Sequence, residues 1–243
     1  TDLETGQPAL DHIRTALKSG KHVVTSNKGP VALHYQDLMD LAAENGLQVG
    51  VEGTVMSGTP ALYLGRDLLA GAGITRIQGI VNGTTNYILT RMEAGAPYAD
   101  ALADAQERGY AEADPTGDVE GYDAAGKAVI LANMLMDAHL TMADVERQGI
   151  SKLTLRDIAE AASAGERWKL IALVERTDGD VRASVQPRRL PIDHPLASVG
   201  GATNAVTYST DLLGDVTLIG PGAGRTETGY ALIGDLLAIP ANR

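Results

Sequence analysis

Residues 22–51 read HVVTSNKGPVALHYQDLMDLAAENGLQVGV, and this stretch decides the fold class. Residues 22–25 form a short apolar run, and residues 35–45 have the spacing of a helix that Gly46 ends. A second apolar run follows at residues 47–51. Because short strands that alternate with helices are typical of parallel sheets, the stretch predicts an α/β fold.

The same alternation extends over the rest of the chain. Helices are predicted at residues 9–19, 60–70, 84–93, 98–108 and 118–135, and a strand at residues 75–81. After residue 140 the pattern is mixed, with short helices at 142–147 and 155–164, strands at 170–176, 181–187, 206–210 and 216–219, and a last helix at 226–237. Asp178-Gly179 lies between two of these strands and predicts a hairpin.

The composition is that of a globular protein with one large domain or two small ones. Of the 243 residues, 44% are hydrophobic and 21% are charged. The 20 basic and 31 acidic residues give a net charge of −11, which argues against nucleic acid or an anionic membrane surface as a partner.

No apolar run reaches the roughly 18 residues of a membrane span, and the opening residues lack a signal-peptide pattern. We therefore expect a cytoplasmic protein. The absence of cysteine excludes disulfides, thiolate metal sites and cysteine nucleophiles.

Two stretches lie at the carboxyl ends of predicted strands, where α/β folds bind ligands. Residues 23–30 contain Lys28, whose ammonium can act as a point charge beside a carbonyl oxygen or a phosphate. A solvated loop lysine would have the same sequence context. Residues 52–60 can direct carbonyl oxygens and the Glu52 carboxylate at a hard cation, or they can form an ordinary tight turn.

Two further stretches are rich in small or polar residues. Residues 81–87, VNGTTNY, lead from a strand into a helix, and the N–H groups at a helix N-terminus favour an anion such as a substrate carboxylate. Asn82 and Thr84 can equally be helix caps. Residues 220–224, GPGAG, leave the backbone open to a ligand, although their spacing is not that of a dinucleotide-binding turn.

Residues 109–127, GYAEADPTGDVEGYDAAGK, are the densest in ionisable groups, with five carboxylates within twelve residues. Asp123 and Lys127 are spaced i,i+4 and so share one helix face. Their neighbours are mostly small and apolar, which favours a half-buried pair that can exchange protons with a substrate. Burial would lower the pKa of Lys127 and Asp123 would raise it, so the sequence leaves the direction of the shift open.

Taken together, the five stretches resemble the homoserine dehydrogenase family in order and spacing, from about residue 9 to residue 237. The most specific matches are Ser26-Asn27-Lys28, residues 82–87, and residues 109–115 followed by Asp118, Asp123 and Lys127. This family interconverts L-homoserine and L-aspartate 4-semialdehyde with NAD(H) or NADP(H), in the route to threonine and methionine. The resemblance implies an NAD(P)-dependent oxidoreductase that acts on an alcohol group.

The resemblance also implies roles for individual residues. Lys127 corresponds to the general acid/base that acts on the C4 oxygen of the substrate, and Lys28 to the catalytic lysine between cofactor and substrate. Asp123 and Glu112 correspond to carboxylates that bind homoserine and hold its ammonium group. Further pocket positions are Asp118, Thr84 and Tyr110.

Two more groups of positions follow from the same resemblance. Gly222 corresponds to a glycine that approaches the cofactor. A monovalent cation, sodium or potassium, would be held mostly through backbone oxygens. The positions that match this cation site are Glu52, Val55, Ser57 and Thr59.

Family members place a strand, a Gly-rich turn and a helix well before the Ser-Asn-Lys motif, and this chain opens at Thr1 without them. We therefore expect a partial Rossmann-type parallel sheet from residues 1–50 and 212–243, the remnant of the NAD(P)-binding domain. Residues 51–211 are expected to form an α/β catalytic and dimerisation domain with a mixed sheet, in a homodimer of the short, monofunctional type. We expect the chain by itself to bind cofactor weakly and to be catalytically incomplete.

The sequence alone also allows a non-catalytic α/β module that binds a small amino acid or serves in assembly. In that case the residues above would be caps, turns and ion pairs. The enzyme is favoured because the chain has only six lysines, and two of them stand at family spacing from three carboxylates. Phosphorylating semialdehyde dehydrogenases act on the same aldehyde through a cysteine, and the chain has none.

Overall fold

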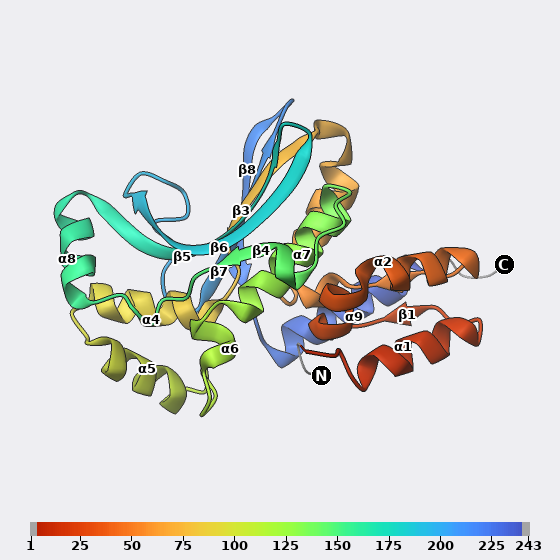
Figure 1. Cartoon of the computed structure of the whole chain (residues 1–243), viewed down its shortest axis with the longest axis horizontal. Coiled ribbons are helices and arrows are strands. Elements are labelled where there is room, and N and C mark those ends of the chain that lie inside the picture. Colours follow the sequence, from red (N-terminus) through yellow and green to blue (C-terminus); the bar gives the residue numbers. More distant parts are fainter. Residues whose placement is uncertain (1–3, 240–243) are drawn as a thin grey trace.

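In the computed structural model, which describes residues 4–239, the chain folds into a larger and a smaller part (Figure 1). The larger part is built on a six-stranded sheet, and the smaller part, at the right of Figure 1, on a two-stranded parallel sheet. Residues 1–3 and 240–243, the two ends of the predicted NAD(P)-binding remnant, lie outside the described residues. None of the described helices has the length and apolar character needed to cross a membrane.

The smaller part contains the strand–helix–strand unit that the sequence predicts. Strands β1 (Val23–Val24) and β2 (Val49–Gly50) pair in parallel, and α2 (Lys28–Glu44) connects them. Helix α1 (Ala9–Lys18) packs against α2, and α9 (Arg225–Ala238) returns from the end of the chain to contact both strands. The parallel α/β prediction is confirmed here.

Helix α2 begins at Lys28 rather than at residue 35, where the helical pattern predicted its start. Gly29 and Pro30 fit the first turn, because proline is tolerated where the helix has no donor to lose. The backbone leaves the helical region at His34, with φ −137° and ψ 33°, so the predicted start corresponds to the segment after this kink. Lys28 therefore lies at a helix N-terminus rather than in a loop.

The larger part is a mixed sheet with strand order β4-β6-β5-β3-β7-β8, in which only the β4–β6 pair is parallel. Asp178-Gly179 forms the turn between β5 and β6, as predicted. The strands are β3 (Ile74–Ile80), β4 (Val145–Arg147), β5 (Glu166–Thr177), β6 (Asp180–Pro191), β7 (Thr203–Thr210) and β8 (Gly214–Pro221).

The short helix predicted at residues 142–147 is not formed, and the second half of this range is strand β4. A 3₁₀ turn, η4 (Met142–Asp144), occupies only the first half of that range, and the Thr141–Asp144 capping box closes it. The second half is extended because buried Val145 pairs with Ala183 of β6. A pattern this short does not distinguish a turn followed by a strand from one helix.

The helices of the larger part lie around this sheet (Figure 1). They are α3 (Ala61–Tyr63), α4 (Gly83–Glu93), α5 (Tyr98–Glu107), α6 (Thr116–Val119), α7 (Tyr122–Leu135) and α8 (Leu155–Ser163), with a 3₁₀ turn η1 (Glu52–Thr54) before them. The helix predicted at residues 60–70 is broken into α3, the π-helix η2 (Leu64–Leu68) and the 3₁₀ turn η3 (Ala70–Ala72). Gly65 in η2 packs closely on Leu135, whose side chain would have to shift to admit a Cβ there.

The helix predicted at residues 118–135 is two helices, α6 and α7, with Gly121 between them at φ +80°. This left-handed residue turns the chain, so that α7 starts in a new direction. Helix α7 is buried along ten consecutive residues, from Ala124 to Asn133, as its small and apolar composition predicted.

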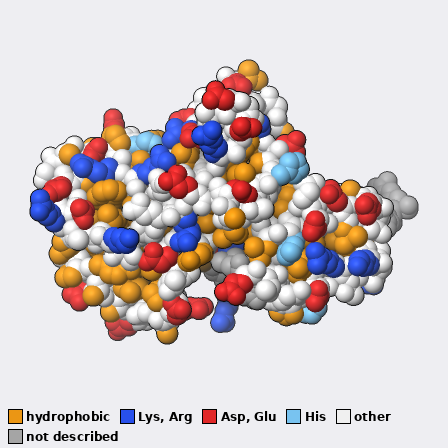
Figure 2. Space-filling view, in the orientation of Figure 1, with side chains coloured by type: hydrophobic (Ala, Val, Ile, Leu, Met, Phe, Trp, Pro, Cys, Tyr) orange, Lys and Arg blue, Asp and Glu red, His pale blue; other side chains and the backbone are white. Residues whose placement is uncertain are grey.

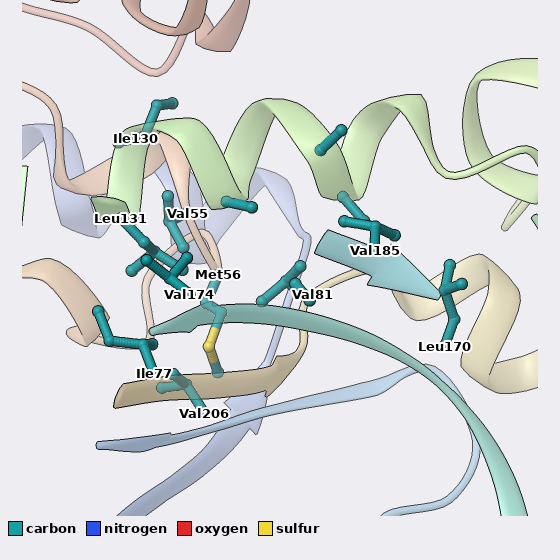
Figure 3. Close-up of a cluster of buried hydrophobic side chains, with 14 of the residues drawn as sticks. Val55, Met56, Ile77, Val81, Ile130, Leu131, Leu170, Val174, Val185 and Val206 are labelled. Carbon is teal, nitrogen blue, oxygen red and sulfur yellow. The ribbon is translucent and has the colours of Figure 1, made fainter. Parts of the chain in front are cut away.

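The main core lies between α7 and the sheet. Figure 3 shows Leu131 of α7 close to Val174 of β5, on the side of the helix that faces the sheet. Ile130 points to the opposite side of α7 and belongs to the same core cluster. Helix α7 also contacts α2 of the smaller part. One buried helix therefore holds the two parts together.

The sequence analysis assigned residues 212–243 to the NAD(P)-binding remnant. In the structure β8 pairs with β7 along its whole length, so this strand belongs to the six-stranded sheet. Of the residues from 212 to 239, those of α9 lie against β1 and β2. On the face shown in Figure 2, acidic and basic side chains are interspersed.

Replacement of Gly121 tests its role as the turn between α6 and α7. In Gly121→Ala a left-handed backbone would carry a Cβ, which would lie 3.1 Å from Val185 Cγ1. We expect the free energy of unfolding, measured by urea denaturation, to fall by about 1–2 kcal/mol. The matched control is Gly117→Ala in α6, where a Cβ meets nothing within 4 Å and stability should be unchanged or higher. Equal losses in both variants would contradict the argument.

Candidate active site

A cleft of about 870 Å³ lies where the two parts meet, and all five stretches identified in the sequence line it. Of the predicted site residues, those that line the cleft are Lys28, Ser57, Thr84, Tyr110, Glu112, Asp118, Asp123, Lys127 and Gly222. Three of the predicted cation positions, Glu52, Val55 and Thr59, do not line it. Residues 220–224 and Lys28 share the cleft, as the predicted layout requires.

Asp123 bridges two lysines at the centre of the cleft. Its Oδ2 lies 2.8 Å from Lys127 Nζ, and its Oδ1 accepts a hydrogen bond from Lys28 Nζ. Lys127 Nζ also donates to the carbonyl oxygen of Val81, at 2.6 Å. Lys127 is only 8% exposed, so most of its charge is shielded from water by protein.

The members of this cluster come from three segments that are far apart in the sequence. Lys28 is the first residue of α2, Asp123 and Lys127 lie on one face of α7, and Val81 is the residue that follows β3. Because α7 is lined by Ala124, Ala125 and Gly126, the backbones can approach closely enough for these contacts. The predicted i,i+4 pair is therefore a buried pair.

The surroundings move the pKa values of the two partners in a defined direction. Burial lowers the pKa of Lys127, and the charge of Lys28 adds to this, while Asp123 opposes it incompletely. Burial would raise the pKa of Asp123, but the two ammonium groups outweigh it, so the pKa lies below its usual range. The direction that the sequence left open for Lys127 is downward.

Asp118 lies beside this cluster. Asn82 Nδ2 donates to Asp118 Oδ1 at 2.7 Å and to Asp123 Oδ2 at 2.9 Å. Burial raises the pKa of Asp118, although the hydrogen bond from Asn82 opposes the shift. Asn82 also accepts from the backbone N–H of Thr85, which confirms it as the cap of α4.

Three predicted pocket residues lie further out. Thr84 donates to the carbonyl oxygen of Tyr110 at 2.6 Å, so its hydroxyl fixes the loop above the cleft. The ring of Tyr110 packs on Tyr87, with ring centroids 4.8 Å apart. Glu112 is exposed at the rim and makes no contact with the lysine cluster.

Gly222 lines the cleft with backbone atoms that no side chain covers. A side chain there would overlap the carboxamide of Asn204, which is fully buried. Neither polar atom of that carboxamide has a hydrogen-bond partner among the described residues. Glycine is therefore the residue that this packing requires.

The predicted cation turn uses its side chains for other contacts. The Glu52 carboxylate accepts from the N–H groups of Leu62 and Tyr63, at 3.0 and 2.7 Å, and burial raises its pKa to about 7. Ser57 and Thr59 bond through their hydroxyls to Thr228 and to the carbonyl oxygen of Pro221. These contacts direct the side chains of the turn toward neighbouring residues.

Within the part of the chain from residue 4 to 239, no group of three or more His, Asp or Glu side chains is placed to hold a metal ion. The carbonyl oxygens of Val55 and Ser57 accept no hydrogen bond from another described residue. Met56 and Ser57 both have positive φ, at 57° and 54°, so this turn adopts an uncommon backbone conformation. Such a turn suits an oxygen-coordinated ion of the alkali type better than a transition metal.

Sequence reasoning missed several residues of the site. Ser26 and Thr228 line the cleft, and Val81 contributes only its carbonyl oxygen, which no side-chain pattern could reveal. Asn82 was considered as a cap and not as a partner of two carboxylates. Its position directly after a buried strand was the available signal.

Comparisons with known proteins agree with the family resemblance found in the sequence. The family model described as homoserine dehydrogenase matches residues 60–237. The chain is 55% identical over 235 residues to an NAD(+)-dependent homoserine dehydrogenase of Pseudomonas canavaninivorans, which covers 96% of this chain and 67% of that protein.

Solved structures of homoserine dehydrogenases have the same fold as this chain. A homoserine dehydrogenase from Thiobacillus denitrificans superposes with a TM-score of 0.93 at 38% identity, over 95% of this chain and 54% of that one. A hyperthermophilic archaeal homoserine dehydrogenase in complex with NADPH gives a TM-score of 0.81 at 38% identity, over 94% of this chain and 67% of that one. The cleft, the fold and these relatives together identify the chain as a member of the homoserine dehydrogenase family, NAD(P)-dependent oxidoreductases that act on an alcohol group.

Proposed function

We propose that Lys127 of this chain moves the proton in the interconversion of L-homoserine and L-aspartate 4-semialdehyde. The observation that carries the proposal is the buried amine of Lys127, held by the carbonyl oxygen of Val81 and by Asp123 Oδ2 inside the cleft. A neutral amine has two N–H groups and one lone pair. If both N–H groups are donated to these two oxygens, the lone pair remains free to accept the hydroxyl proton of homoserine.

The lowered pKa of Lys127 supports this role. An ordinary lysine, with a pKa of about 10.4, is a poor base near neutral pH. Burial lowers this pKa and so increases the fraction of neutral amine at a given pH. In the reverse direction the protonated amine returns the proton to the alkoxide that forms from the aldehyde.

The other cleft residues suit binding and orientation. Lys28, held by Asp123, is proposed to polarise the substrate oxygen and to contact the cofactor. Asp123 and Glu112 are proposed to bind homoserine and its ammonium group, with Asp118 nearby. Thr84 and Tyr110 complete the pocket through the bond that fixes their loop.

The residues present fit the nicotinamide end of a cofactor. Gly222 offers backbone that no side chain covers, and Lys28 adds a positive charge in the same cleft. When bound, NAD(P) supplies the hydride acceptor for the oxidation of homoserine. The carbonyl oxygens in the turn of Glu52, Val55, Ser57 and Thr59 are proposed to hold a sodium or potassium ion.

We propose that the chain divides into an NAD(P)-binding remnant and a catalytic and dimerisation domain. After Pro221 the chain returns to the NAD(P)-binding remnant. A homodimer is supported by β8, an edge strand of the sheet that exposes Ile219, with Leu212 and Leu213 at the adjoining turn. A cytoplasmic location suits an enzyme that uses nicotinamide cofactors and a free amino acid. The non-catalytic module is not favoured, because the chain belongs to an enzyme family.

Substitution of the two lysines tests their separate roles. In the full-length protein, Lys127→Ala should lower kcat for homoserine oxidation by about 10²–10⁴-fold, the usual effect of losing a general base, with a smaller change in cofactor Kd. Lys28→Ala should weaken cofactor binding as well as turnover. Lys152, which is exposed, gives the control variant Lys152→Ala, with unchanged kinetics. If Lys127→Ala keeps near-normal turnover while Lys28→Ala abolishes it, the two assignments must be exchanged.

The pH dependence of homoserine oxidation tests the coupling of Asp123 to Lys127. The rate should rise with pH as Lys127 loses its proton, with a midpoint below the usual lysine pKa. In Asp123→Asn the negative partner is lost, so the pKa of Lys127 falls and the midpoint moves to lower pH, while kcat/KM drops. Asp40→Asn, a change at an exposed acid, is the control and should leave the profile unchanged. A midpoint that stays or rises in Asp123→Asn would disprove the coupling.

Replacement of Gly222 tests the cofactor contact. Gly222→Ala places a methyl group into the carboxamide of Asn204, so the loop must shift and NADPH affinity should fall at least tenfold, measured by fluorescence titration. Gly229→Ala in α9 is the matched control, because a Cβ there meets nothing within 4 Å. Unchanged affinity in Gly222→Ala would argue against a cofactor role for this loop.

A further inference from the structure

We propose that Asn82 is a positioning residue for the proton transfer, whose carboxamide holds Asp118 and Asp123 side by side and thereby fixes Asp123 between the two lysines. The proposal rests on the proposed function, because it concerns the geometry in which Lys127 acts. Asn82 touches no reacting atom in this scheme and acts through the two carboxylates.

The amide nitrogen of Asn82 bridges the two acids. Nδ2 lies 2.7 Å from Asp118 Oδ1 and 2.9 Å from Asp123 Oδ2, and each of its two hydrogens can serve one carboxylate. Asn82 is 5% exposed, so water competes little for these bonds. Hydrogen bonds to ionised acceptors are stronger than those between neutral groups.

The orientation of this carboxamide is fixed by its other end. Asn82 Oδ1 accepts from the backbone N–H of Thr85 at 2.8 Å and from the Thr85 hydroxyl at 2.9 Å. A flipped amide would direct its oxygen at two carboxylates and its NH₂ group at an N–H donor, which is repulsive at both ends. The cap of α4 therefore decides which atoms of Asn82 face the acids.

Asp118 and Asp123 would repel each other without this bridge. Burial and the charge of Asp123 raise the pKa of Asp118, whereas the hydrogen bond from Asn82 lowers it, as do the charges of Lys127 and Lys28. Among the described residues, Asn82 is the one that donates a hydrogen bond to the carboxylate of Asp118. Loss of the bridge would therefore leave Asp118 buried, unpaired and more easily protonated.

The bridge also sets the position of Lys127. Asp123 Oδ2 receives both the Asn82 amide and the ammonium of Lys127, so the place of this oxygen determines where the amine can lie. Val81, whose carbonyl oxygen holds the other side of Lys127, directly precedes Asn82 in the chain. One two-residue segment thus fixes both contacts of the proposed base.

Two substitutions separate the bridge from the cap. Serine and aspartate are both good N-cap residues, so both Asn82→Ser and Asn82→Asp should preserve α4. Tm should fall only by the lost bonds to the acids in Asn82→Ser and further in Asn82→Asp, and both variants should remain folded at the assay temperature. Neither can donate to both acids, and Asn82→Asp adds a third carboxylate. In the full-length enzyme we expect kcat/KM to fall about 10- to 100-fold in Asn82→Ser, as for a lost charge-assisted hydrogen bond, and further in Asn82→Asp.

In the reduction of the aldehyde Lys127 acts in its protonated form, so the acid limb of that pH profile reports on the carboxylates and gives a readout that a cap would not affect. Loss of a donor raises the pKa of an ionised carboxylate, so the pH below which kcat/KM declines should rise in Asn82→Ser and rise further in Asn82→Asp. A purely capping role predicts the wild-type profile in both variants. That outcome, with turnover unchanged, would overturn the proposal.

A measurement on the protein without substrate separates this inference from the role of Lys127. Titration of ¹³C-labelled aspartate carboxyls by NMR should show a raised pKa for Asp118 in Asn82→Ser, whether or not Lys127 is the base. An unchanged aspartate titration in the folded variant would overturn the bridge. If the aspartate titration shifts while Lys127→Ala retains full turnover, the bridge stands and the proposed function of Lys127 fails.

Discussion

Asp123 sits inside the molecule between two lysines, and the arrangement of the cleft depends on this contact. Its two oxygens face Lys127 and Lys28, so loss of the Asp123 carboxylate would leave two neighbouring ammonium groups without their shared partner. The lysines come from α7 and α2, which belong to different parts of the fold. The same carboxylate that organises the site therefore also joins the two parts at the cleft.

The packing of α7 makes this placement possible. Small residues near its start let it approach both α2 and the sheet, and Ile130 and Leu131 further along enter the main core (Figure 3). Gly121 turns the chain before this helix, so the direction of α7 is fixed at its N-terminus. The lysine cluster is therefore enclosed by packed elements, whereas the rim, with exposed Glu112, is open to solvent.

The parallel unit and the hairpin at Asp178-Gly179 could be predicted from the sequence, because periodicity and spacing report on local structure. The gathering of the five stretches in one cleft followed from the resemblance to the family. The sequence did not predict the break at Gly121, since the apolar pattern runs on across a residue that changes the backbone direction. The true start of α2 was missed because Gly-Pro suits both a turn and a first helical turn. Asn82 contacts Asp118 and Asp123, which lie 36 and 41 positions further along the chain, and no local sequence pattern predicts such contacts.

The two acids that Asn82 joins have pKa values shifted in opposite directions. The lysines lower that of Asp123, whereas burial raises that of Asp118. Such divergence often separates roles within a site, because one group keeps a fixed charge while the other responds to what binds. On the proposed function, Asp123 stays ionised as the partner of both lysines. Asp118 makes its hydrogen bond with Asn82 and no ion pair with a lysine among the described residues, so its charge depends more on its surroundings than that of Asp123 does.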